Sequence, residues 1–211
     1  MRSLLATLFV VIATLASAKG EKSGVFDYWV MSLSWSPNWC AQEGAARNSP
    51  QCAPSAKNGW VLHGLWPQYH RGWPSFCPTT QPQPSRTQTA AMADLMGTSG
   101  LAWYQWKKHG TCAGLSARQY YALARKAYGT IIRPPVFRKL AKPVRLPASV
   151  VEQAFLKANP GLTPDMITVT CANGYIQEAR ICLSKSLTPV PCGRDTVRDC
   201  KLKDALFEPT H

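Results

Sequence analysis

The chain has 211 residues, which is enough for one domain with a substantial hydrophobic core. Hydrophobic residues make up 45% of it and charged residues 17%, a composition that excludes an acidic or polyampholytic disordered protein. Lysine and arginine number 24 against 11 aspartates and glutamates, so the formal net charge is +13, and the expected partners are polyanions: nucleic acid, anionic lipid or acidic polysaccharide.

The N-terminus has the organisation of a secretory signal peptide. Arg2 is a short basic region, an apolar run follows, and Ala18 ends a small-x-small cleavage site. A membrane anchor is the alternative, but spanning takes about 20 apolar residues, and this run meets polar residues from Lys19 onward. We therefore predict that residues 1–18 are removed and that residues 19–211 form one exported domain, periplasmic or extracellular and free of the membrane.

In chain order, two strands come first. Residues 26–35 are rich in aromatic and β-branched side chains and show the alternation of a strand. Residues 60–65 form a second, short strand pattern. Residues 78–88 are rich in proline, glutamine and threonine and are interpreted as an exposed loop.

Helices and a hairpin are predicted downstream. Four helical patterns follow, at residues 89–96, 101–109, 117–128 and 149–157. Ser149 and Glu152 stand three residues apart and predict a capping box at the start of the last helix. Asn173-Gly174 favours a type I′ turn between strands at residues 167–171 and 175–183. The last thirty residues are interpreted as loop held by cysteines, and this order of elements predicts an α+β fold with a sheet backed by helices.

The eight cysteines favour disulfides, because their number is even and the chain is predicted to enter an oxidising compartment. Structural zinc is the alternative, but no two cysteines have C-x2-C or C-x4-C spacing and no histidines form an HxH or HExxH pattern. Spacing alone leaves the connectivity open.

Charge and aromatic residues are unevenly distributed along the chain. Residues 95–151 contain ten lysines and arginines and no aspartate or glutamate, which predicts a basic face. All eight tryptophans lie between Trp29 and Trp106. Aromatic side chains beside a cationic surface bind single-stranded nucleic acid, where stacking contributes about 1–3 kcal/mol per base. For any one tryptophan, however, a place in the core is the simpler interpretation.

Two histidine motifs carry the predicted chemistry. The first, WVLHGLWP, places His63 near the end of an apolar strand, just before Gly64, where the backbone can pass close to a ligand. In the second, WKKHGTC, a helix that ends at the histidine places Gln105, Lys108 and His109 on one face.

Two imidazoles can divide the work of an acid and a base at about pH 6 to 7. RNA cleavage needs such a pair, because a base removes the 2′-hydroxyl proton and an acid protonates the departing 5′-oxygen. A lysine at the phosphate stabilises the developing charge, and no metal is required. For either histidine alone, a hydrogen-bonded structural role is the alternative.

Three blocks closely resemble the ribonuclease T2 family of secreted endoribonucleases, in the family's order and approximate spacing: SWSPNWC at residues 34–40, HGLWPQ at 63–68 and KHGTC at 108–112. The resemblance extends from about Phe26 to Cys200. It implies an α+β fold with a central antiparallel sheet packed with helices, and no cofactor. It also implies cleavage of single-stranded RNA through a 2′,3′-cyclic phosphate to 3′-phosphate ends. RNA is then the partner, and we expect a monomer.

The resemblance also implies individual roles. His63 matches the family's general acid, His109 the base, and Lys108 the lysine that stabilises the pentavalent phosphate. Trp66 matches an aromatic residue beside the base-binding site. The disulfides implied are Cys40–Cys52, Cys77–Cys112, Cys171–Cys200 and Cys182–Cys192.

The chain departs from the family's second motif, H-E-W-x-K-H-G, at two positions. Tyr104 replaces the histidine and can still donate a hydrogen bond to phosphate. Gln105 replaces the glutamate, and an amide cannot carry the negative charge that would raise the pKa of a nearby histidine. The altered motif keeps two alternatives open: an exported cationic RNA- or polysaccharide-binding protein with this fold and weak or no turnover, and a basic cell-envelope protein or toxin.

Overall fold

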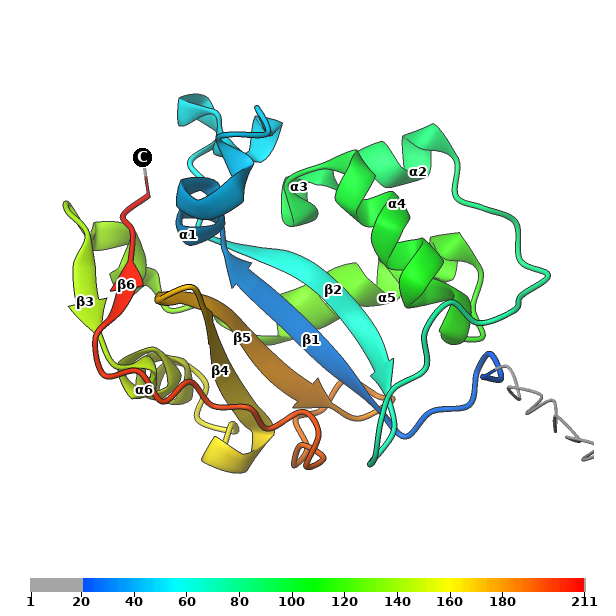
Figure 1. Ribbon diagram of the computed structural model, residues 1–211. Coiled ribbons are helices and arrows are strands. Elements are labelled where there is room, and N and C mark those ends of the chain that lie inside the picture. The colour runs from blue at the N-terminus through cyan, green and yellow to red at the C-terminus, as the bar shows by residue number, and fades with distance from the viewer. Residues whose placement is uncertain (1–20, 211) are drawn as a thin grey trace, which may run out of the picture.

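The computed structural model describes residues 21–210, so the predicted signal peptide lies outside the described residues. One six-stranded sheet runs through the molecule (Figure 1). Its strands are β1 (Tyr28–Trp35), β2 (Trp60–Gln68), β3 (Val144–Leu146), β4 (Ile167–Ala172), β5 (Tyr175–Leu183) and β6 (Ala205–Phe207).

The central strand is β1, which pairs antiparallel with β2 on one side and β5 on the other. β4 and β5 form the predicted antiparallel hairpin. β6 pairs antiparallel with β3 and joins β5 through a single parallel pair. The predicted α+β class with a mainly antiparallel sheet is confirmed. β3 and β6 were not predicted from the sequence, because three residues are too few to show an alternating pattern.

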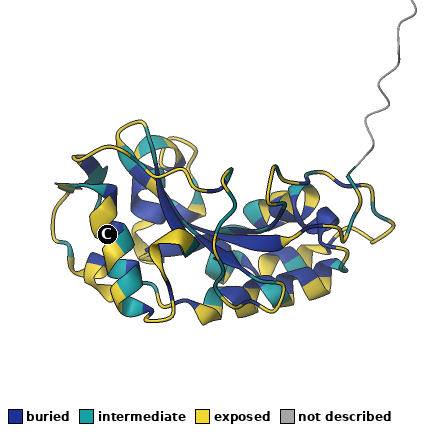
Figure 2. Ribbon diagram, turned by 90° about the horizontal axis from the view of Figure 1, so that it is seen from below, coloured by how far each residue is buried: buried dark blue, intermediate teal, exposed yellow. Residues whose placement is uncertain are grey.

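Helices cover the core face of this sheet. The helices are α1 (Ser36–Trp39), α2 (Arg86–Ala90), α3 (Ala93–Met96), α4 (Ser99–Lys108), α5 (Ala117–Thr130) and α6 (Ala148–Ala158). Short 3-10 or π-helical turns lie at Cys40–Gly44, Pro50–Cys52, Pro54–Ala56, Gly110–Cys112, Pro135–Lys139 and Pro164–Met166. α4 and α5 pack against β2, and α6 packs against β4. Figure 2 shows the central strands almost wholly buried and the outward-facing sides of the helices exposed.

Two details of the helices differ from the sequence prediction. The pattern at residues 89–96 is split between α2 and α3. The capping box at Ser149 is wrong, because α6 begins one residue earlier, after the extended Pro147, and no side chain caps it. Capping boxes occur instead at Ser85 and Ser116, each with a glutamine three residues later.

Four cations of the predicted basic face have partners within the structure. Arg125 forms an ion pair with Asp94, and Arg133 donates to the carbonyls that end α5 while its guanidinium lies over the Tyr128 ring. Arg138 and Arg145 donate to backbone carbonyls of distant segments. These four cations therefore link elements of the fold to one another.

Half of the tryptophans lie in the core, and the other half are partly or largely accessible. Trp29, Trp35, Trp60 and Trp106 are buried in one cluster. No helix within the described part of the chain is both long enough and apolar enough to cross a membrane.

Four disulfides link the described residues, in the pairs expected from the family resemblance: Cys40–Cys52, Cys77–Cys112, Cys171–Cys200 and Cys182–Cys192. The largest loop, of 35 residues, is closed by Cys77–Cys112, and the smallest, of 10, by Cys182–Cys192.

Loop length predicts different stabilities for two double variants. Closing a longer loop removes more entropy from the unfolded chain, by about 1 kcal/mol between these two lengths. We expect Cys77→Ala/Cys112→Ala to lower the free energy of unfolding by about 1 kcal/mol more than Cys182→Ala/Cys192→Ala. Urea denaturation measures both, and equal losses would contradict the expectation.

Candidate active site

His63 lies on a β-bulge in β2. Along β1, the residue opposite Gly64 is followed directly by the residue opposite Leu62, so His63 is an extra residue without a partner. Leu62 and Leu65 both face the core, and the bulge therefore leaves His63 and Gly64 together on the other face. The strand does not end near His63, as the sequence predicted, but continues to Gln68.

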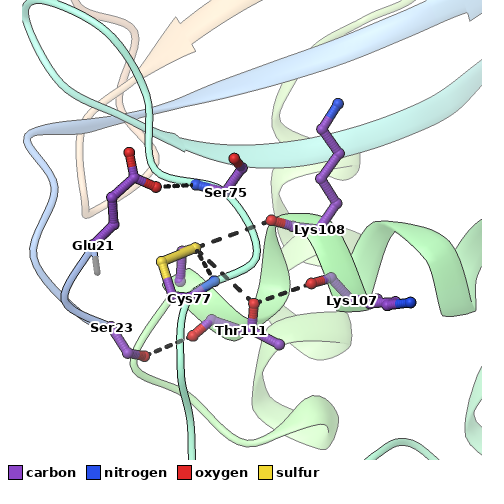
Figure 3. Close-up of a disulfide and its surroundings, with 8 residues drawn as sticks. Glu21, Ser23, Ser75, Cys77, Lys107, Lys108 and Thr111 are labelled. Atoms are coloured by element: carbon purple, nitrogen blue, oxygen red, sulfur yellow. Dashed lines mark hydrogen bonds between the residues drawn. A yellow bond between two sulfur atoms is a disulfide. The ribbon is translucent and has the colours of Figure 1, made fainter. Parts of the chain in front are cut away.

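The second group of site residues comes from the C-terminal turn of α4. Lys108 is its last residue, and His109 is the C-cap, which donates its backbone N–H to the Gln105 carbonyl. The Cys77–Cys112 disulfide ties the following turn to the preceding loop (Figure 3). Figure 3 also shows the Lys108 side chain extending toward β2 and that of Lys107 pointing away. The disulfide therefore fixes the C-terminal end of α4, which carries Lys108 and His109.

Gly64 allows α4 to approach β2 closely. A Cβ at this position would lie 2.2 Å from both Gln105 Oε1 and Trp66 Nε1. The indole Nε1 donates a hydrogen bond of 2.7 Å to Gln105 Oε1, in the space that a side chain would occupy. The motif predicts that the backbone at Gly64 passes close to a ligand. The structure corrects this, since the neighbours that need the room are protein side chains.

The two histidines and Lys108 line one cleft of about 480 Å³. The His63 ring stands edge-on to the Trp66 indole with centroids 5.4 Å apart. The His109 ring stacks on the same indole at 5.2 Å. Other residues lining the cleft include Trp73, Tyr104, Gln105, Glu178, Arg180, Asp195 and Arg198. The structure thus brings together groups that are 46 positions apart in sequence.

His63 contacts a carboxylate from two strands away. Its Nδ1 is hydrogen-bonded to Oε1 of Glu178 on β5. The other oxygen, Oε2, accepts from Nε and Nη2 of Arg180 at 2.8 and 2.6 Å. Between β2 and β5, β1 presents Ser32 and Ser34 on this face. These small side chains leave room for an imidazole and a carboxylate to meet above the central strand.

The surroundings of Glu178 and His109 determine their charges at neutral pH. Burial alone raises the pKa of Glu178, but the hydrogen bonds and charges of His63 and Arg180 lower it to about 2. Burial, together with the charges of Lys108 and His63, lowers the pKa of His109 from 6.5 to about 3. Nδ1 of His109 is buried and has no hydrogen-bond partner among the described residues. At neutral pH, Glu178 is therefore a carboxylate and His109 a neutral imidazole.

The remaining residues singled out from the sequence also reach the cleft. Tyr104 lines it and is 44% exposed, whereas Gln105 is 1% exposed and held by Trp66. Sequence reasoning missed Glu178 and Arg180. Their signal was a pair of oppositely charged residues two positions apart in the strand pattern at residues 175–183, since such residues share one face of a sheet.

Comparisons with known proteins identify the family to which a chain with this sheet, cleft and set of disulfides belongs. The model of the Ribonuclease T2 family matches residues 26–192. The chain belongs to the ribonuclease T2 family. Among solved structures, ribonuclease MC1 from the seeds of bitter gourd is similar, with a TM-score of 0.63, 20% identity, and coverage of 86% of this chain and all of the other.

Two bacterial relatives match over shorter stretches. A ribonuclease of Aeromonas hydrophila is 43% identical over 128 residues, which cover 59% of this chain and 56% of the relative. A probable ribonuclease of Haemophilus influenzae is 32% identical over 120 residues, covering 51% of this chain and 44% of the relative. The chain thus spans about half the length of these curated relatives.

A methyl group at Gly64 tests the packing of the site. We expect Gly64→Ala to break the hydrogen bond between Trp66 and Gln105, because its Cβ takes the space of both atoms, and to lower the free energy of unfolding by about 1–3 kcal/mol. Gly100→Ala, in the first turn of α4, has open space around its Cβ and is the control. Chemical denaturation compares them. A Gly64→Ala protein as stable as the control would contradict this packing.

Proposed function

We propose that the protein is a metal-independent endoribonuclease that cleaves single-stranded RNA by transphosphorylation. The observation that carries the proposal is that His63, His109 and Lys108 line one cleft, and that both imidazole rings pack against the Trp66 indole. Family membership and the names of the relatives point to the same substrate class.

In the first step, neutral His109 removes the proton of the 2′-hydroxyl, and O2′ attacks the adjacent phosphorus. The Lys108 ammonium stabilises the charge that builds up on the phosphoryl oxygens. His63, as the imidazolium, protonates the departing 5′-oxygen, so the products are a 2′,3′-cyclic phosphate and a 5′-hydroxyl. In the second step the roles reverse, and water opens the cyclic ester to a 3′-phosphate.

The division of roles follows from the surroundings of the two rings. His109 has a pKa of about 3, so it is neutral and can accept a proton at neutral pH. His63 is hydrogen-bonded through Nδ1 to the Glu178 carboxylate, which leaves its Nε2 available for proton transfer. These environments support His63 as acid and His109 as base, in agreement with the roles implied by family resemblance.

Aromatic side chains and cations at the cleft supply binding. We assign Trp66 and Tyr104 to substrate binding, with Tyr104 donating to phosphate. Trp73 is 45% exposed and also lines the cleft, and an exposed indole is a surface on which a base can stack. Arg198 also lines the cleft and adds a positive charge there.

The export route completes the proposal. Removal of the signal peptide would leave residues 19–211 as one catalytic domain, monomeric, in the periplasm or the extracellular medium. Four disulfides among the described residues support an oxidising compartment.

Digestion of single-stranded RNA in EDTA tests the proposed activity. We expect the wild-type protein to cleave RNA, and His63→Ala and His109→Ala each to lower kcat/KM by about 10²- to 10⁴-fold, because each removes a proton-transfer group. A 2′-deoxy substrate should bind and stay intact. RNA that is retarded on a gel but not cleaved by the wild-type protein would contradict the proposal and support the cationic binding protein.

The pH profile tests the role of Gln105. Because His109 is neutral above its pKa of about 3, the acidic limb of kcat/KM should lie well below pH 6.5. Gln105→Glu keeps the acceptor for Trp66 and adds a negative charge one helical turn from His109. That charge stabilises the imidazolium, so the acidic limb should move to higher pH by about one unit. Gln88→Glu, a helical glutamine outside the cleft, is the control, and identical limbs in all three proteins would show that Gln105 does not affect the titration.

A further inference from the structure

We propose that Glu178, held by Arg180, is the positioning residue of the general acid: it fixes the tautomer and orientation of His63. This inference rests on the proposed ribonuclease function and extends it to a residue on β5 that lies outside both histidine motifs.

The hydrogen bond to Glu178 determines which nitrogen of His63 can act on substrate. An ionised carboxylate only accepts, so Nδ1 must carry the proton in this contact. Nε2 is then the nitrogen available to the substrate, as an acceptor in the neutral ring and a donor in the charged one.

The carboxylate is itself immobilised. Arg180 binds Oε2 through two nitrogens and leaves Oε1 for His63, so the two oxygens have separate partners. Glu178 is 2% exposed, and at that burial an anion needs both partners to remain charged. A purely structural ion pair with Arg180 would not require an imidazole on the other oxygen.

Other polar groups at the cleft do not pair a carboxylate with an imidazole. Nδ1 of His109 has no partner among the described residues. Asp195 also lines the cleft, but its Oδ2 accepts from the backbone N–H of Gly72. Gln105, on the helix opposite, is uncharged. Among the described residues, Glu178 is therefore the carboxylate that pairs with a histidine of the site.

Glu178→Gln tests the proposal with little change in volume. An amide keeps an acceptor for one partner but removes the charge. We expect kcat on RNA to fall by at least about 10-fold, and by no more than in His63→Ala, with KM changed little. Thermal unfolding and affinity for a 2′-deoxy oligonucleotide check that the variant is folded and binds. Glu152→Gln, on α6 outside the cleft, should behave as wild type.

A change of leaving group separates positioning from structural damage. A nucleoside 3′-(4-nitrophenyl phosphate) releases a phenolate that needs no proton, so a defect in the acid should cost it less than about 3-fold. We therefore expect Glu178→Gln and His63→Ala to be impaired on RNA and nearly normal on this ester. His109→Ala should be impaired on both substrates.

A double variant completes the test. If Glu178 acts through His63, His63→Ala/Glu178→Gln should be no slower on RNA than His63→Ala alone. Equal losses on both substrates, or additive losses in the double variant, would overturn the assignment. The assignment would also be overturned if Glu178→Gln cleaved RNA at the wild-type rate while His63→Ala was slow. In that case the ribonuclease function would stand. Failure of the wild-type protein to cleave either substrate would overturn both proposals.

Discussion

The close contact between α4 and β2 at Gly64 is the constraint on which the site depends. Because this residue has no Cβ, the Gln105 amide and the Trp66 indole meet directly above the strand. That contact sets the distance between the bulge carrying His63 and the helix end carrying His109. The disulfide after His109 and the buried ring of Trp106 then hold the helix end in place. Two histidines far apart in sequence become neighbours of one indole as a result.

A second consequence is that the two imidazoles have opposite surroundings. His109 is buried and lies beside the charges of Lys108 and His63, so its pKa falls and the ring stays neutral. His63 is more accessible and contacts Glu178, whose charge Arg180 sustains. The neutral Gln105 belongs to this arrangement, because a negative charge on α4 would act against the low pKa of His109. The carboxylate of this site lies on the sheet and serves the other histidine.

Periodicity and short motifs predicted much of this from the sequence. The alternation of residues 26–35, the Asn173-Gly174 turn and the amphipathic pattern of α5 depend on neighbours in the chain, and these predictions are confirmed. The bulge at His63 was not predicted, although Leu62 and Leu65, both core residues three positions apart, break the strand alternation and indicate it. Glu178 was missed because its partner lies 115 residues away, and only the folded sheet brings them together.

The most direct test of the account is nitrogen NMR of the two imidazoles in the free protein. We expect the His109 ring to remain neutral as the pH falls through 6.5, toward its pKa of about 3. We also expect a proton on Nδ1 of His63, with a signal that changes when Glu178→Gln removes the negative charge of its acceptor. A His109 ring that titrates near its ordinary value of 6.5, or a His63 signal unchanged by Glu178→Gln, would contradict the division of charge proposed for this cleft.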